Sequence, residues 1–209
     1  MDLDGYRVMG PARTVMDVAR ERGVAAGVVA ADHALHHGLV DAGLLSAAFE
    51  TCAGWPGRKA ARITLLSADG AAESPLESLS RLRIAAQGLP APRLQTEICD
   101  ESGRFLGRCD FYWDEFGVVG EADGDLKYEP GRPAVVKERH RQKQFEETGL
   151  IVVRWGWSDV YSFEAVARRL RAAYARGYRR GSSERRWATI APPPGLHPQA
   201  PLARRIRGA

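Results

Sequence analysis

The chain has 209 residues, of which 44% are hydrophobic, 8% aromatic and 27% charged. These values are typical of a globular protein and exclude a disordered chain, a collagen-like fibre and a small disulfide-stapled domain. No apolar run is long enough to cross a membrane, and the acidic first residues do not resemble a secretory signal. The three cysteines, Cys52, Cys99 and Cys109, are odd in number and form no CxxC motif. We therefore expect a cytoplasmic protein with no membrane partner.

Positive charge is concentrated towards the C-terminal end. The chain carries 30 Lys and Arg residues against 26 Asp and Glu residues, a net charge of +4. Seven arginines and one acid lie in residues 177–209, so this segment carries +6 and residues 1–176 carry −2. Five of the 12 prolines lie there as well. We expect a disordered basic tail, which either touches phosphates without sequence specificity or is solvated without a partner.

Helix-spaced apolar residues predict an all-helical module over residues 1–70. Its four helices are expected to begin at Pro11, Val24, Asp41 and Pro56, and the last three to end near His37, Phe49 and Ser67. His33, His36 and His37 fall in the second helix, where two imidazoles on one face can bind a metal. No cysteine or carboxylate pattern completes such a site, so we expect none there.

From Glu73 onward the pattern becomes a mixture of helices and strands. Ser74, Pro75 and Glu77 form the start of a helix, with Ser74 as cap and Glu77 in a capping box, and Gly88 ends it. The later elements are expected as strands over 94–99, 105–113 and 118–123, a helix over 133–148, a strand over 151–155 and a helix over 163–175. This order of helix, three strands, helix, strand, helix predicts one α/β domain over residues 73–176.

Three acidic residues are expected to meet on the second and third strands. A four-residue turn over 114–117 places Asp110 opposite Glu121, with Asp123 two residues further on the same face. Like charges that face each other destabilise a sheet, so a positive group is expected there. Arg108, opposite Asp123, neutralises one charge, and a divalent cation would neutralise the others. A hydrated edge strand and a register shifted by one residue are the alternatives.

The ligand types indicate which cation such a site would bind. Carboxylates without neighbouring His or Cys suit Mg²⁺ or Mn²⁺, which keep several waters and contact phosphates. Such an ion lowers the pKa of a bound water and stabilises charge on a phosphodiester. We therefore expect Asp110, Glu121 and Asp123 to be metal ligands. Lys127 either holds the phosphate and poises the water or is a solvated loop residue.

The chain resembles the Vsr-like family of actinobacterial proteins in five blocks that occur in the same order: Glu73–Ser78, Arg108–Phe111, Val119–Gly124, Arg141 with Phe145 and Gly149, and Val152–Trp155. Vsr denotes very-short-patch-repair endonucleases, a branch of the PD-(D/E)XK nuclease superfamily. The match covers residues 73–175. It implies a restriction-endonuclease-like core, dependence on Mg²⁺ and hydrolysis of phosphodiester bonds in DNA.

The resemblance implies roles for single residues. Asp110 resembles the invariant acid of the superfamily motif, and Glu121 resembles the acid on the next strand. Glu77 resembles the acid of the first helix, a position that its capping box explains equally well. Asp123 stands where the motif has lysine, and Vsr enzymes use a histidine shortly after this strand, where Lys127 stands nearby. The catalytic base therefore stays open, and no residues match the Vsr zinc site.

Two arginines extend the predicted site. Arg141 shares a helix face with Glu138 and Phe145, so it reaches towards the acids, where it pairs with an acid or a phosphate. Arg154 in the last strand is expected near the same network. We expect Lys127, Arg141 and Arg154 to bind nucleic acid.

The segment Gly10–Val18 resembles the stretch after the winged helix of AbiEi-type antitoxin proteins, which makes residues 1–70 a remnant of such a module. The expected function is a metal-dependent DNA endonuclease in DNA repair or in defence against foreign DNA, with no small-molecule cofactor. The alternative is a catalytically weak or inactive DNA-binding or antitoxin-like regulator on the same fold, which Asp123 at the lysine position favours. A third class is an interaction protein whose tail binds the partner.

Overall fold

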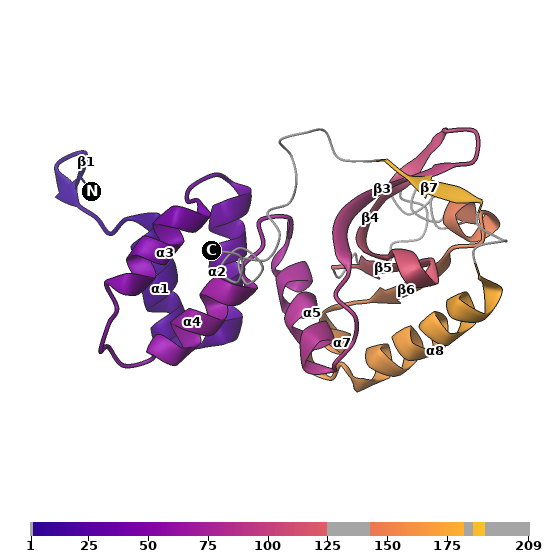
Figure 1. Ribbon diagram of the computed structural model, residues 1–209. Helices are drawn as coiled ribbons and strands as arrows, with labels where there is room; N and C mark the ends of the chain where they lie inside the picture. The colour runs from indigo at the N-terminus through magenta and orange to yellow at the C-terminus, as the bar shows by residue number, and fades with distance from the viewer. Residues whose placement is uncertain (1, 125–142, 182–185, 191–209) are drawn as a thin grey trace. The chain divides into compact units, whose positions relative to one another are not determined.

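The computed structural model describes residues 2–124, 143–181 and 186–190 (Figure 1). The chain forms two compact units, and it passes from the first to the second between Leu82 and Arg83. The first unit thus extends about ten residues beyond the helical module expected over residues 1–70. No helix among the described residues has the length and apolar character that a membrane span requires. The expected α/β class is confirmed.

The first unit is helical apart from one short hairpin. Its elements are β1 (Asp2–Leu3), β2 (Tyr6–Arg7), α1 (Pro11–Arg22), α2 (Val24–His36), α3 (Ala42–Glu50), α4 (Arg58–Ser67) and the start of α5 (Pro75–Ala86). Asp41 caps α3 as expected, since its carboxylate accepts from the Leu44 N–H at 2.7 Å. Helix α4 begins two residues later than expected, because Gly57 has a φ of +77° and holds the chain in a turn.

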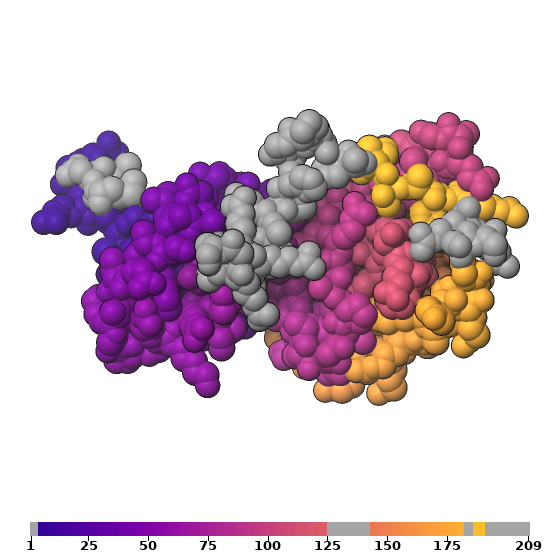
Figure 2. All heavy atoms as spheres, viewed as in Figure 1, coloured from indigo at the N-terminus to yellow at the C-terminus, as the bar shows by residue number. Residues whose placement is uncertain are grey.

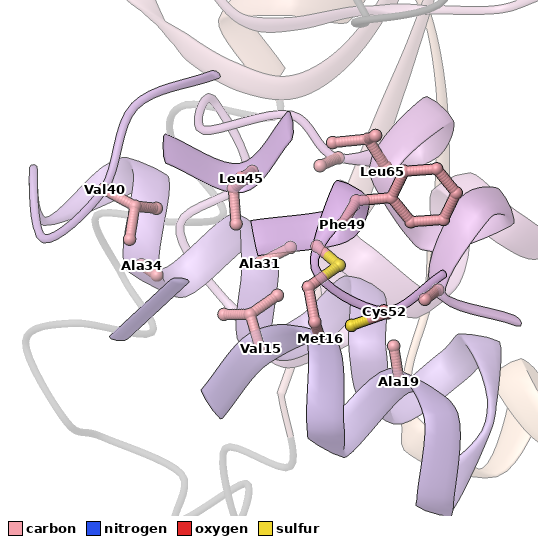
Figure 3. Close-up of a cluster of buried hydrophobic side chains, with 12 residues drawn as sticks. Val15, Met16, Ala19, Ala31, Ala34, Val40, Leu45, Phe49, Cys52 and Leu65 are labelled. Carbon is pink, nitrogen blue, oxygen red and sulfur yellow. The ribbon is translucent and has the colours of Figure 1, made fainter. Parts of the chain in front are cut away.

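Apolar side chains from the first four helices form the core of this unit (Figure 3). Met16, Leu45 and Cys52 are fully buried there, and Phe49 and Leu65 pack around them. Helix α2 passes very close to its neighbours at Gly27, where an added Cβ would lie 2.6 Å from the Ala19 Cβ and would also collide with Thr64. The alanine- and glycine-rich sequence is thus required by close helix packing.

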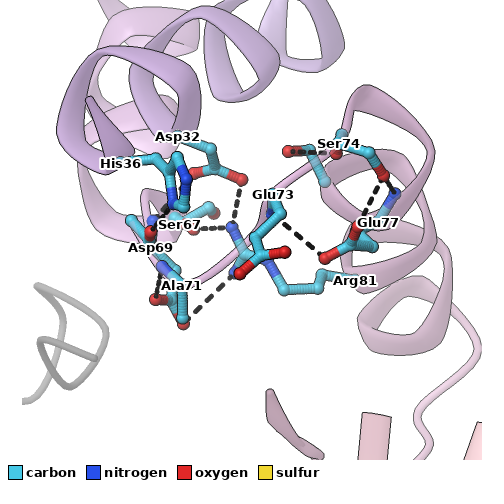
Figure 4. A network of polar contacts seen from close by, with 11 residues as sticks. Asp32, His36, Ser67, Asp69, Ala71, Glu73, Ser74, Glu77 and Arg81 are labelled. Atoms are coloured by element: carbon cyan, nitrogen blue, oxygen red, sulfur yellow. Dashed lines mark hydrogen bonds and ion pairs between the residues drawn. The ribbon is translucent and has the colours of Figure 1, made fainter. Parts of the chain in front are cut away.

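A buried charge network fixes the chain that leads from α4 into α5 (Figure 4). The Arg81 guanidinium lies 2.6 Å from the Asp32 carboxylate and donates to the Ser67 carbonyl at 3.0 Å. Asp32, only 1% exposed, also accepts from the Asp69 N–H at 2.8 Å. Because Arg81 is anchored to α2 in this way, the first part of α5 belongs to the helical unit rather than to the α/β domain.

The second unit contains a mixed five-stranded sheet. Its strands are β3 (Arg93–Asp100), β4 (Phe105–Trp113), β5 (Val118–Ala122), β6 (Ile151–Trp155) and β7 (Trp187–Thr189), in the order β6-β5-β4-β3-β7. Only β5 and β6 are parallel. The one-turn helix η1 (Asp114–Phe116) joins β4 to β5, as the sequence predicts. Of the helix expected over 133–148, residues 143–147 are helical and residues 133–142 lie outside the described part.

The two faces of the sheet have different cores. On one face, aromatic rings of the strands pack against α8 (Glu164–Arg180), with Trp113 and Tyr174 centred 5.4 Å apart. On the other face, Tyr112 and Val119 form a cluster with Phe145 and Leu150. The short helix α7 (Trp157–Tyr161), which the sequence analysis did not predict, connects β6 to α8.

The expectation of a disordered tail from residue 177 is wrong for two segments. Helix α8 continues to Arg180, because Gly177 packs directly on the Phe116 carbonyl and any larger residue would collide with it. Strand β7 adds to the free edge of β3 and pairs Ala188 with Cys99. The yellow atoms of β7 accordingly adjoin the pink atoms of β3 and β4 in Figure 2. The Trp187 indole N–H also donates to the Tyr112 hydroxyl at 2.8 Å.

Candidate functional site

The register of the β4–β5 hairpin is the one that the sequence predicts. Trp113 pairs with Val118, and Tyr112 pairs with Val119. Continuing this register places Asp110 opposite Glu121. The ladder between β4 and β5 ends at Gly120, whereas β5 continues beside β6 as far as Ala122. The predicted acids therefore lie beyond the end of the β4–β5 ladder, where β5 still pairs with β6.

Beyond the last ladder pair, the side chain of Asp110 accepts a hydrogen bond from the backbone of β5. Its carboxylate accepts from the Ala122 N–H at 2.8 Å, in place of a strand carbonyl. The side chain of Asp110 is half-buried and comes from β4, so one carboxylate oxygen is fixed against the backbone of β5. This bond joins the two strands beyond their last ladder pair and orients Asp110 next to the Glu121 position.

Glu121 is buried and lies on the face opposite the aromatic core. It is 2% exposed, and its parallel neighbour on β6 is Arg154. The preceding Gly120 lies under the Trp155 ring, where an added Cβ would be 2.6 Å from the ring edge. Since successive side chains of a strand point to opposite faces, Glu121 points away from this aromatic layer. A buried carboxylate is costly unless a positive group stabilises it, which makes this the most demanding position on the sheet.

Arg154 connects the acids to the last helix. Its guanidinium forms an ion pair with Asp123 at 3.1 Å, and its carbonyl accepts from the Arg169 guanidinium at 2.9 Å. The prediction that Arg154 lies in the acidic network is confirmed. Arg108, the expected partner of Asp123, is exposed on β4 and pairs in register with Glu97 of β3. Sequence reasoning missed the Asp123–Arg154 pair because the two residues are 31 positions apart and belong to different strands.

Within the part of the chain that the structure describes, the acids can hold a cation only as a pair, with the other ligands supplied from elsewhere. Among the described residues, no three His, Cys, Asp or Glu side chains are grouped as a metal site. Asp110 and Glu121 supply two carboxylates on one face, whereas Asp123 is engaged by Arg154. Mg²⁺ is commonly bound by one or two carboxylates, with waters and substrate phosphates as the other ligands. The Asp110–Glu121 pair therefore fits Mg²⁺, and Asp123 fits it only after exchanging its arginine.

Glu77 has a clear structural role at the start of α5 (Figure 4). The Ser74 hydroxyl donates to its carboxylate at 2.6 Å, and the Glu73 N–H donates to it at 3.0 Å. The Glu77 N–H donates to the Ser74 hydroxyl oxygen at 3.2 Å, which completes the capping box. Glu77 belongs to the first unit, whereas Asp110 and Glu121 belong to the second. Its catalytic role stays a prediction.

Two further residues of the predicted site, Lys127 and Arg141, lie outside the described part of the chain. Their roles in phosphate binding stay predictions for the same reason. Three of the predicted residues, Asp110, Glu121 and Asp123, are brought together with Arg154 at the ends of β5 and β6.

Comparison with known proteins adds two relatives. No family model matches the chain, and no solved structure matches it. The chain is 30% identical over 151 residues to "Uncharacterized protein MT2308" of Mycobacterium tuberculosis (strain CDC 1551 / Oshkosh) and equally to "Uncharacterized protein Rv2248" of strain H37Rv. Each match covers 72% of this chain and 55% of the relative. The chain thus spans about half the length of the curated relatives that it matches.

Proposed function

We propose that the protein is a metal-dependent endonuclease with a restriction-endonuclease-like core, which hydrolyses phosphodiester bonds in DNA. The observation that carries this proposal is the placement of Asp110 and the buried Glu121 on adjacent strands and on one face of the sheet. Two carboxylates on facing positions of adjacent strands destabilise each other unless a cation binds between them. A divalent cation with open water positions is the group that best satisfies such a pair.

In such a site, the residues at the strand ends have different roles. Asp110 and Glu121 hold the ion, and the Ala122 N–H keeps the Asp110 carboxylate in place. When bound, the ion supplies a water of lowered pKa and stabilises charge on the phosphate. The Arg154 guanidinium lies at the same edge, where it forms an ion pair with Asp123. When substrate binds, this guanidinium leaves Asp123 and binds a phosphate oxygen. Lys127 and Arg141 contribute the remaining positive charge.

A second candidate is a DNA-binding regulator of the antitoxin type that keeps the fold without hydrolysis. The Asp123–Arg154 ion pair favours it, because an acid stands at the position of the motif lysine and neutralises the nearest described cation. The two candidates share the fold and differ in whether the Asp110–Glu121 pair supports cleavage.

Cleavage assays separate these candidates. Supercoiled, linear, mismatched and single-stranded DNA are incubated with Mg²⁺ or Mn²⁺ and the native protein, Asp110→Asn or Glu121→Gln. Glu115→Gln is the matched control, since Glu115 is an exposed acid on η1 in the same unit. Endonuclease action predicts cleavage by the native protein and the control, and its loss in both site variants. Cleavage that both site variants retain, or its absence from the native protein on every substrate, refutes the proposal.

A further inference from the structure

Helix α8 carries an unusual concentration of positive charge. It holds six arginines and one acid, Glu164, so its 17 residues carry a charge of +5, which exceeds the +4 of the whole chain. Outside α8, residues 1–163 carry −5 and residues 181–209 carry +4. The charge of α8 is distinct from that of residues 181–209, because α8 is a continuous helix with Val166, Leu170 and Tyr174 buried.

Three of these arginines form one solvent-facing row. Arg168, Arg176 and Arg179 are exposed, and we call them the basic face. At 100° per residue they fall within a sector of about 80°. The buried residues Leu170 and Ala173 lie on the opposite side of the helix. Ala172 is the other exposed position between the three arginines in this sector, and Ala175 borders it, so short side chains separate the arginines.

The remaining three arginines of α8 have structural partners. Their guanidinium groups donate to backbone carbonyls of neighbouring elements at 2.8 to 3.1 Å, and the residues are Arg169, Arg171 and Arg180. The basic face, in contrast, makes no hydrogen bond or ion pair with the residues that the structure describes. Like charges three or four positions apart destabilise a helix. The helix dipole compensates for Arg179 in the last turn but not for Arg168 or Arg176.

The spacing of the basic face suits an extended anion. From Arg168 to Arg179 the helix axis rises by about 16 Å, which corresponds to roughly five base pairs of duplex. Guanidinium groups bind phosphates in a bidentate manner. Such a surface reads the backbone and not the sequence.

We infer that the basic face of α8 binds the phosphate backbone of duplex DNA. Arg169, which follows Arg168 in the helix, donates to the Arg154 carbonyl, so the row begins near the end of β6. The basic face lies on the α8 side of the sheet, whereas Asp110 and Glu121 lie on the other side, so it is a contact surface separate from the acids. This inference deepens the proposed function and rests on it for the choice of DNA as the partner.

The test measures binding without cleavage. Fluorescence anisotropy follows a labelled duplex in EDTA while the salt concentration rises from about 50 to 200 mM. The test variant replaces Arg168, Arg176 and Arg179 by alanine, which favours the helix. The control variant replaces Arg7, Arg22 and Arg62, three exposed arginines of the first unit, and changes the net charge equally. Circular dichroism verifies that both variants are folded.

The inference predicts a loss in the test variant alone. Each phosphate contact contributes about 0.9 to the slope of log K against log salt, so the slope falls by roughly 2 to 3. Affinity at the lowest salt falls at least about tenfold, whereas the control stays within about twofold of the native protein. Equal losses in both variants, or a loss in neither, overturn the inference.

Two comparisons identify the binding partner and distinguish failure of this inference from failure of the proposed function. Vesicles of phosphatidylserine and phosphatidylcholine are titrated in parallel, and a loss of vesicle binding with unchanged duplex binding overturns the choice of DNA. Because binding is measured in EDTA, it does not depend on hydrolysis. Failed cleavage with intact, α8-dependent binding refutes only the nuclease, whereas cleavage with unaltered binding in the test variant refutes only the basic face.

Discussion

Replacing Arg81 by methionine tests the buried charge network of the first unit. The substitution keeps most of the side-chain volume and removes the guanidinium that lies 2.6 Å from Asp32 and 3.0 Å from the Ser67 carbonyl. Asp32 is 1% exposed, so the variant leaves a buried carboxylate without its cation. The loop that Arg81 fastens to α2 loses its main polar contact at the same time.

The structure gives the size of the effect. Removing one partner of a buried ion pair costs about 3 to 5 kcal/mol. Asp32 keeps its hydrogen bond from the Asp69 N–H at 2.8 Å, so we expect the lower end of this range, about 3 kcal/mol. For a unit of this size, about 3 kcal/mol corresponds to a Tm roughly 12 to 24 °C lower.

The loss should also depend on pH. Burial raises the pKa of Asp32 above 3.8, and Arg81 opposes that shift, so the pKa rises further in the variant. When the pKa in the folded state lies above the unfolded-state pKa of 3.8, the group stabilises the protein at pH values below 3.8. This contribution is lost as the pH rises through the folded-state pKa. The destabilisation of the variant is therefore smaller at about pH 4 than at about pH 7.

Urea denaturation followed by circular dichroism at both pH values measures these quantities. Arg62→Met is the matched control, because Arg62 is exposed on α4 in the same unit. The double variant Asp32→Asn with Arg81→Met should recover part of the loss, since it leaves no buried charge. A loss below about 1 kcal/mol, or one equal to that of the control at both pH values, would refute the reasoning.

Three further predictions concern other parts of the fold. Gly27→Ala should lower stability by about 1 to 3 kcal/mol in a urea melt, despite the helix preference of alanine, because its Cβ would lie 2.6 Å from that of Ala19; an unchanged midpoint would contradict this. Trp187→Phe removes the hydrogen bond to Tyr112 and should cost about 1 kcal/mol and speed amide exchange in β7, with unchanged exchange as the contrary result. The hydrogen bonds of Ser102 and Arg104 lower the pKa of Asp100 to about 2, so an NMR titration should find it ionised until the pH falls through about 2, and a midpoint near 3.8 would refute the turn geometry.

The sequence predicts the elements whose signals are local. The limits of β4 at Phe105 and Trp113 and the turn that follows were read correctly, because an apolar strand and a glycine-ended turn fix them. The capping side chains of α3 and α5 were found for the same reason. The hairpin register followed from the turn length, and it placed Asp110 beside the Glu121 position.

Features that depend on distant partners were missed. Strand β7 has three residues in an arginine-rich segment, and only the free edge of β3 makes it a strand. The boundary inside α5 follows from the Asp32–Arg81 pair, whose members are 49 positions apart. Helix α8 extends past residue 176 because Gly177 fits against η1, a contact that no helix pattern predicts. The ion pair between Arg154 and Asp123 likewise depends on the parallel alignment of β5 and β6, which no local pattern indicates.

The central claim is that Asp110 and Glu121 hold a divalent cation, and Mn²⁺ binding tests it most directly. Titration followed by electron paramagnetic resonance compares the native protein with Asp110→Asn, Glu121→Gln and the exposed control Glu115→Gln. The account predicts one bound Mn²⁺ in the native protein and the control, and affinity at least about tenfold weaker in each site variant, since each removes a carboxylate ligand. Native Mn²⁺ affinity that survives both site substitutions, or no binding by the native protein in the presence of duplex DNA, would contradict it.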